Sequence, residues 1–395
     1  MFHFSGVAHK PEYGVLIDIS SGSVGVAIVS SLPNSPEPTL LYRHRNSMRV
    51  TTHGTEGIRR VRETLFSTAL ILSQEGMSIL GQHDPHARIS RLFVTCSAPW
   101  AHTMSRSVYY ESDKPFKITT AVMNDLIESA EAEIHAAIEQ NPDIDETRYD
   151  TVERATVDAT VNDYPVEHPL HLKGKSLGLS HVAGLIPHDI LDAVHEIQGK
   201  LFPQTELRTH TCMLVVYCVL RDLFPKIDSL CIIDTTGEAT EIAVVEHHTL
   251  IENTSMPIGV NTLIRNIMEE TNKPASDIQS VIELHDGELH ADEQSYRSCT
   301  DAYVENFSQT LDAIMEKRPL PKNIVFLTQR THQAFFVPLI TKAFERSLGI
   351  KPNFLNLQSK MAPHTGTPIG EDLYLELDAR FFHKMHGCGE LDSQK

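Results

Sequence analysis

The sequence has no long apolar run and comparatively little positive charge. No stretch of about 18 consecutive apolar residues occurs, and the opening MFHFSGVAHK lacks the apolar core of a signal peptide. We therefore expect a soluble, cytoplasmic protein whose membrane contact, if it has one, is peripheral. Lysine and arginine number 34 against 52 aspartates and glutamates, which gives a formal net charge of -18. A chain this acidic is not expected to bind nucleic acid, because binding to the phosphate backbone relies on positive charge.

Cysteine is also scarce, and no CxxC pair occurs. This spacing argues against a zinc ribbon and against a disulfide framework, and it predicts buried free thiols in a reducing compartment. The segment FFHKMHGC brings His383 and His386 close to a cysteine, but the spacing matches no common zinc pattern. We interpret it as part of a tail. The six cysteines are Cys96, Cys212, Cys218, Cys231, Cys299 and Cys388.

The first hundred residues alternate between strand and helix patterns. An apolar hairpin is expected over 13–31, followed by a Pro-rich turn and a third strand over 39–50. Apolar residues at helical spacing predict a helix within 54–76, and RISRLFVTCSAPW over 88–100 predicts a buried strand. This order favours a mixed sheet with helices packed against it.

The middle of the chain has a different character. FKITTAVMNDLIESAEAEIHAAIEQ over 116–140 predicts a strong helix that Thr119 or Thr120 caps. TVERATVDATVNDYPVEHP alternates like a pair of strands, so we interpret this region as a small α+β insertion. Two helices are expected after it, over 189–202 and 210–224. The second is apolar on all sides and should be buried.

An approximate internal repeat is the most informative feature. VLIDISSGSVGVAIVSS over 15–31 and SLCIIDTTGEATEIAVV over 229–245 each place an aspartate and a turn of small residues between two apolar strands. Two such hairpins predict two similar halves that face each other across a cleft. Turns rich in Gly, Ser and Thr offer backbone N–H groups and hydroxyls to phosphate, and the aspartates suit Mg²⁺. The alternative is that Asp18 and Asp234 are ordinary turn residues with local hydrogen bonds.

These two turns resemble the first and second phosphate motifs of the actin, heat-shock chaperone and sugar-kinase superfamily. FKITTAVMNDLIESAEAEI with VNDYPVEHPLHLKGKSL resembles the inserted SHS2-type subdomain of FtsA and PilM, and MPIGVNTLIRNIMEETNKPASDIQSVIEL resembles the segment that follows their second motif. The resemblance, over residues 13–345, implies an α/β protein. Its fold would be the two-lobed actin-like (ribonuclease H-like) ATPase fold with a small α+β, SHS2-like inserted subdomain.

The resemblance also implies a division of the chain. The first actin-like half would comprise residues 13–105 and 186–228, and the inserted subdomain residues 106–185. The second half would comprise residues 229–385, with residues 1–12 and 386–395 as tails.

By the same resemblance, ATP and Mg²⁺ bind between the two turns, and Asp18 and Asp234 hold the metal. Glu238 stands where a glycine is common, and the letters TQR stand where the adenosine motif usually has glycines. These departures predict weak binding or no turnover, and Arg330 is expected to pair with Glu238 or to stack on the base. The implied nucleotide-binding residues are Asp18, Ser20, Ser21, Gly22, Ser23, Asp234, Thr235, Thr236, Gly237, Glu238, Leu327, Thr328, Gln329 and Arg330.

The implied function is that of a scaffold, at most a slow ATPase, which recruits cell-division machinery at the cytoplasmic face of the bacterial inner membrane and associates with itself into protofilaments. The first alternative is a PilM-like type IV pilus assembly protein, which grips a short cytoplasmic peptide of a membrane partner in the inserted subdomain. The acidic stretch after Gly370 is poorly suited to an anionic membrane, so a partner is expected to bring the protein there. The second alternative, a small-molecule kinase, calls for a catalytic aspartate, and none is obvious after TCSAPW. A peptide-binding chaperone of the heat-shock type would need a separate β-sandwich after about residue 380, and the residues up to 395 are too few for one.

Overall fold

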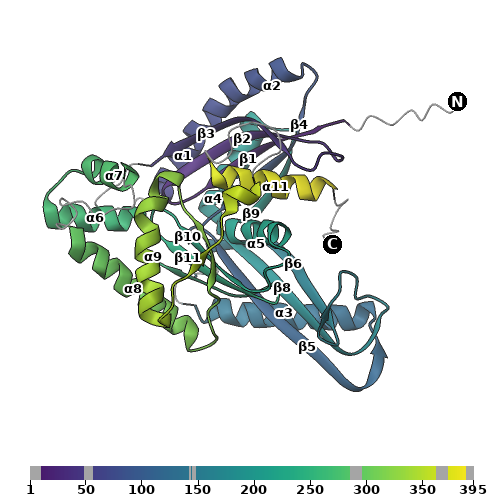
Figure 1. Cartoon of the computed structure of the whole chain (residues 1–395). Coiled ribbons are helices and arrows are strands. Elements are labelled where there is room, and N and C mark those ends of the chain that lie inside the picture. The colour runs from purple at the N-terminus through teal and green to yellow at the C-terminus, as the bar shows by residue number, and fades with distance from the viewer. Residues whose placement is uncertain are drawn as a thin grey trace.

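The protein is described by a computed structural model over residues 10–48, 57–141, 144, 148–284, 296–361 and 372–387. Its strands form two five-stranded sheets and one four-stranded sheet. In Figure 1 the first sheet lies at the top, the second lies in the middle, and the third extends toward the lower right with one long helix along it. Among the described residues no helix is both long enough and apolar enough to cross a membrane.

The first sheet contains the expected hairpin. β1 (Glu12–Ile19) is antiparallel to β2 (Ser23–Ser31) and parallel to β4 (Ile89–Cys96). Alternate side chains of β1 face opposite layers. Val15 and Ile17 belong to a core with the outer helices, whereas Leu16 faces the interior of the molecule. The order is β3-β2-β1-β4-β9, with β1 (Glu12–Ile19), β2 (Ser23–Ser31), β3 (Thr39–Ser47), β4 (Ile89–Cys96) and β9 (Glu206–Thr211). The helices of this half are α1 (Gly57–Ile71), a π-helical turn (Leu72–Gly76), α2 (Met77–His83) and α4 (His188–Leu201).

The second sheet repeats this topology, which confirms the internal repeat. β10 (Leu230–Thr235) is antiparallel to β11 (Thr240–Glu246) and parallel to β13 (Asn323–Leu327). The order is β12-β11-β10-β13-β14, with β10 (Leu230–Thr235), β11 (Thr240–Glu246), β12 (Thr249–Met256), β13 (Asn323–Leu327) and β14 (Asn353–Phe354). The helices of this half are α6 (Val260–Thr271), α7 (Ala275–Leu284), α8 (Arg297–Met315), a 3₁₀ turn (Arg330–His332), α9 (Gln333–Leu348) and α10 (Leu357–Met361).

The third sheet lies in the insertion and is antiparallel throughout. Its order is β5-β8-β6-β7, with β5 (His102–Lys117), β6 (Tyr149–Val161), β7 (Tyr164–Pro165) and β8 (Lys173–Pro187). The helix α3 (Thr120–Glu139) begins after Thr119, whose side chain accepts a hydrogen bond from the Val122 N–H, as a capping residue does. Leu126, Ala130 and Ile134 recur every fourth residue and form the face of α3 that is buried.

Two helices fill the space between the large sheets. α5 (Cys212–Leu223) is buried along most of its length, as expected from its apolar sequence. α11 (Leu373–Gly387) packs against α5, and Figure 1 shows the two helices close together. The interpretation of FFHKMHGC as part of a tail is therefore wrong for residues 381–387, which form the last turns of this packed helix. Its apolar residues are interleaved with charges, but at helical spacing they form buried faces.

Among the cysteines and histidines singled out from the sequence, Cys96, Cys212 and His383 lie in packed or hydrogen-bonded positions. Cys96 and Cys212 are buried, and burial raises the pKa of both thiols well above the usual value. His383 bonds through Nδ1 to Ser31 Oγ at 2.8 Å, and its Nε2 lies 3.0 Å from the Ser35 carbonyl oxygen. His383 is thus held by the first half, and Cys388 lies outside the described residues.

Candidate functional site

The two repeated turns are in direct contact. Ser21 Oγ lies 2.8 Å from Thr236 Oγ1 and accepts a hydrogen bond of 2.8 Å from the Glu238 N–H. The backbones also touch, because a Cβ placed on Gly237 would lie 2.6 Å from the Gly22 Cα. The structure therefore brings together the two segments that the sequence predicted to face each other, and it places them in direct contact.

Asp18 is paired with an arginine that sequence reasoning missed. Asp18, Gly25 and Arg45 occupy one row across β1, β2 and β3. Glycine in the middle strand leaves space for the guanidinium, since a Cβ on Gly25 would lie 2.5 Å from the Arg45 Nη2. Arg45 donates to Asp18 Oδ2 at 2.7 Å and to Ser23 Oγ at 2.9 Å. An internal cation is thus paired with the aspartate that was expected to hold Mg²⁺.

The start of α11 completes this arrangement. Asp372 accepts two hydrogen bonds from Arg45, at 2.6 Å and 2.9 Å. Tyr374 donates from its hydroxyl to Asp234 Oδ1 at 2.5 Å. Burial raises the pKa of Asp234 to about 7, although the hydrogen bond from Tyr374 opposes that rise. Both predicted metal ligands are therefore engaged by side chains of the protein itself.

The raised pKa of Asp234 makes the stability depend on pH. The folded protein favours the neutral carboxyl of Asp234, so proton binding at this group adds to the free energy of unfolding. This stabilisation is complete below the unfolded pKa near 4 and is lost as pH rises through about 7. We expect the free energy of unfolding to be larger at pH 5.5 than at pH 8, by on the order of 1–3 kcal/mol from this group. Asp234→Asn, which keeps an acceptor for Tyr374, should reduce that difference. Denaturant unfolding of both proteins at the two pH values measures it, and an identical difference in the two proteins would contradict the assignment.

Glu238 is neutralised by a different residue from the one expected. Arg265 of α6 donates to the two carboxylate oxygens of Glu238, at 3.0 Å and 2.5 Å, and Asn261 adds a hydrogen bond of 3.1 Å. The expected pairing of Glu238 with Arg330 is not the one that the structure shows. Asn261 and Arg265 are four residues apart on one face of α6, and that spacing is the sequence signal that could have identified them.

The third predicted segment lies against both turns. Leu327 is buried at the end of β13, and Thr328 donates from Oγ1 to the Thr235 carbonyl oxygen at 3.0 Å. Gln329 reaches the opposite half, where its Nε2 lies 3.3 Å from Ser23 Oγ. Leu327 and Thr328 therefore support the second turn from the core, and Gln329 links the two halves.

The space left between the halves is small. A cavity of about 40 Å³ lies there, whereas pockets for small ligands are about 300–1,000 Å³.

Within the described residues, no group of three or more His, Cys, Asp or Glu side chains is placed to hold a metal ion. Asp18 Oδ1 and Asp234 Oδ2 are buried without a hydrogen-bond partner, but their other oxygens are already engaged. The closed arrangement does not fit ATP with Mg²⁺, and nucleotide binding stays a prediction that requires the turns to separate. The cavity is bounded by residues that include Ser20, Gly22, Ser23, Thr235, Thr236, Gly237, Gln329, His332 and Tyr374.

The contact between the turns can be tested with a single methyl group. Gly237→Ala would place its Cβ 2.6 Å from backbone that cannot rotate away, so we expect it to lower the free energy of unfolding by about 1–3 kcal/mol. Gly199→Ala is the matched control, because this residue lies in α4 and its added Cβ would meet nothing within 4 Å beyond the adjacent backbone of its own helix. The control should raise stability by up to about 1 kcal/mol. Chemical denaturation compares the two, and equal effects would show that the turns do not touch.

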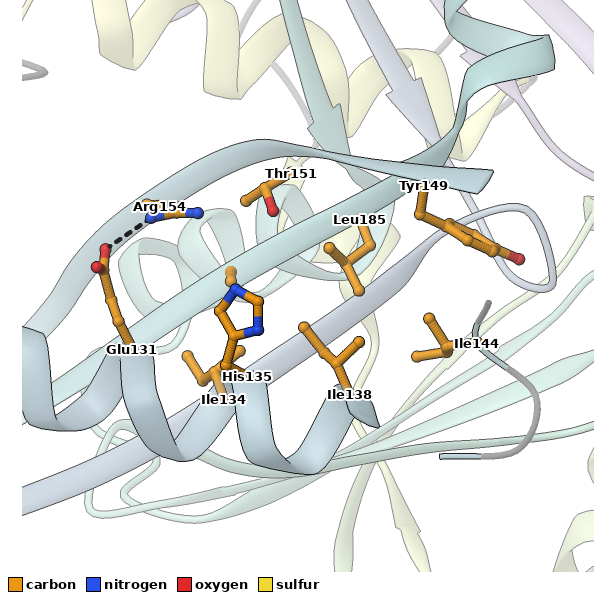
Figure 2. Close-up of a pocket in the computed structure, with 10 residues that line it drawn as sticks. Glu131, Ile134, His135, Ile138, Ile144, Tyr149, Thr151, Arg154 and Leu185 are labelled. Carbon is orange, nitrogen blue, oxygen red and sulfur yellow. Dashed lines mark ion pairs between the residues drawn. The ribbon is translucent and has the colours of Figure 1, made fainter. Parts of the chain in front are cut away.

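A second cavity, which the sequence did not reveal, lies in the insertion. It has a volume of about 180 Å³ and lies between α3 and strands β6 and β8. Figure 2 shows Ile134 and Ile138 of α3 along one side of it, with Leu185 on a strand and Ile144 at one end. At the other end Arg154 Nη1 lies 3.4 Å from Glu131 Oε1. The cavity therefore combines apolar walls with a charged rim.

Comparison with known proteins identifies the fold. No family profile matches the sequence, and no curated protein matches it. A chain of the PilM–PilN type IV pilus biogenesis complex is similar in structure, with a TM-score of 0.55 at 12% identity over 89% of this chain and 90% of that chain. The ethanolamine utilization protein EutJ from Carboxydothermus hydrogenoformans gives a TM-score of 0.44 at 11% identity, over 95% of this chain and 91% of that chain. The protein described here has the actin-like ATPase fold, and in its fold it is PilM-like.

Proposed function

We propose that this protein is a scaffold of the PilM type, which holds an apolar segment of a protein partner in its inserted subdomain. The observation that carries the proposal is the cavity between α3 and the inserted sheet. Ile134, Ile138 and Leu185 give it apolar walls, and the Glu131 and Arg154 pair gives it a rim able to hydrogen-bond to a bound chain. Peptide-binding grooves commonly combine apolar pockets with a few polar groups that fix the orientation of the bound segment. A cavity of about 180 Å³ is smaller than the pocket of a whole small ligand, so we propose that it receives apolar side chains of the segment.

The closed nucleotide cleft supports a scaffold over an enzyme. In the ATP-dependent reading, the two halves would close around the phosphates of the nucleotide. Here the polar groups of the two turns form hydrogen bonds with each other instead, between Ser21 and Thr236 and from the Glu238 N–H to Ser21. The closed state therefore needs no nucleotide to bridge the halves, and the surfaces offered to a partner are present without turnover.

The type IV pilus role is favoured over the division role. The similar structure contains PilM and PilN together, and the cavity in the insertion is a place where a partner segment could bind. We propose by analogy a pilus-type assembly in which the partner is a membrane protein and the segment lies on its cytoplasmic side. ATP, Mg²⁺ and a division partner are retained here only as predictions from the sequence resemblance.

Site-specific photo-cross-linking in the host cell tests this function. A photoreactive residue at His135, which lines the cavity, should form one major adduct with a partner protein. The control places the same residue at His195, an exposed position on α4 of the first half. Ala183→Leu would fill the cavity from within and should abolish the adduct at position 135. Equal adducts at positions 135 and 195, or an adduct that survives Ala183→Leu undiminished, would contradict the proposal.

A further inference from the structure

One short segment holds the aspartates of both halves. Asp372 bonds to Arg45, which bonds in turn to Asp18 of the first half. Two residues later, Tyr374 bonds to Asp234 of the second half. The segment comes immediately before and within the first turn of α11, and it is distant in the sequence from both hairpins. The two turns are therefore linked through a third element as well as by their own contacts.

α11 packs against the cores of both halves, so the link between the two turns is held by buried side chains as well as by hydrogen bonds. Leu375 and Phe382 pack with Leu16 of the first sheet, and Leu377 packs with Ile232 of the second. Leu375, Leu377 and Phe382 are all essentially fully buried. A motion that separates the halves must therefore either pull α11 away from one core or break the hydrogen bonds of residues 372 and 374.

The buried charges around Arg45 hold the start of α11 on the first half. Arg45 lies between the carboxylates of Asp18 and Asp372, with only 15% of its side chain exposed. Removing one partner from such a buried pair leaves a charge without compensation, which is costly. Arg45 also engages Ser23, a hydroxyl of the first turn. The guanidinium thus uses the groups that would otherwise be offered to phosphate or metal.

We infer that Asp372 and Tyr374, acting with Arg45, form an internal latch that holds the two turns closed. This inference goes beyond the proposed function, because it concerns the cleft between the halves and does not depend on a partner in the insertion. It assigns to the start of α11 the bridging role that a bound nucleotide would have in an ATP-dependent protein. Opening of the cleft then requires the contacts of Asp372 and Tyr374 to break in addition to the direct contacts between the turns.

The rate of hydrogen exchange at the Glu238 amide measures how often the two turns separate. This amide donates across the cleft to Ser21 Oγ, so it exchanges when the turns separate. The Thr236 amide is an internal reference, because it donates to Ala239 within its own hairpin. In the double variant Asp372→Asn/Tyr374→Phe, which changes shape very little, we expect exchange at Glu238 to become at least about tenfold faster. Exchange at Thr236 should stay within about twofold of the wild-type rate.

The control variant is Glu376→Gln, which removes a carboxylate one turn further along α11. Its Glu238 amide should exchange at the wild-type rate. The latch is refuted if the double variant exchanges at the wild-type rate, because the turns would then be held by their own contacts alone. It is also refuted if Glu376→Gln accelerates exchange as strongly as the double variant does. Either result would leave the cross-linking at position 135 unaffected, so failure of the latch and failure of the proposed function can be told apart.

Discussion

Replacing Arg45 with methionine is expected to lower the free energy of unfolding by about 3–5 kcal/mol. Asp18 is fully buried, and Arg45 donates the hydrogen bond that its Oδ2 accepts. Asp372 loses two hydrogen bonds in the same variant. Both carboxylates would then remain near each other without a cation. Denaturant unfolding followed by circular dichroism measures the loss.

Two further variants separate the effect of charge from the effect of packing. Arg59→Met removes an exposed arginine paired with Glu63 at 3.8 Å on the surface of α1, and it should cost less than about 1 kcal/mol. In Arg45→Met/Asp18→Asn/Asp372→Asn the whole charged group is removed, so most of the lost stability should return. A triple variant no more stable than Arg45→Met would show that the cost comes from packing. An Arg45→Met protein within about 1 kcal/mol of the wild type would contradict the buried ion pairs.

Replacing Phe382 with alanine is expected to cost about 3–5 kcal/mol. Its side chain is fully buried in α11, where it packs with Phe93 and lies against Gly14. A Cβ on Gly14 would lie 2.4 Å from the Phe382 ring, so β1 and the ring are closely fitted. The variant should also loosen the attachment of α11 to the first half. Thermal and chemical unfolding measure the cost.

The matched control is Lys384→Ala on the same helix. Lys384 bonds to Asp222 at 2.7 Å at the surface, so its removal should cost less than about 1 kcal/mol. If Phe382→Ala were no more destabilising than Lys384→Ala, residues 373–387 would be a loosely attached tail after all. The comparison therefore tests the place of α11 between the two sheets.

Sequence reasoning identified the elements whose patterns are local. The hairpins around Asp18 and Asp234 have strong apolar strands and small turn residues, and α3 has a capping threonine with a regular apolar face. The strand β9 was not expected, because its sequence ELRTHT is polar and short. α11 was misjudged because charged residues such as Asp378 and Arg380 lie among its buried apolar ones. Asp378 is itself buried and accepts a hydrogen bond from Thr95 at 2.9 Å.

The partners across the cleft could not be predicted, because they come from distant parts of the sequence. Arg45 and Asp372 are joined only by the fold, and no spacing in the sequence connects them. The two turns were expected to flank a ligand, but nothing in either hairpin indicates how far apart they lie. That separation depends on α11, Gly22 and Gly237, whose packing is a tertiary property. The cavity in the insertion was missed for the same reason, since α3, β6 and β8 each contribute only part of its wall.

Calorimetric titration of the wild-type protein with Mg-ATP, alongside Asp18→Ala, tests whether the protein's own residues hold the cleft closed. If they do, the wild type gives no saturable heat of binding at micromolar to low millimolar nucleotide. Saturable binding at micromolar concentrations that Asp18→Ala abolishes would contradict a closed cleft, because it would show that the turns separate readily and form a working nucleotide site.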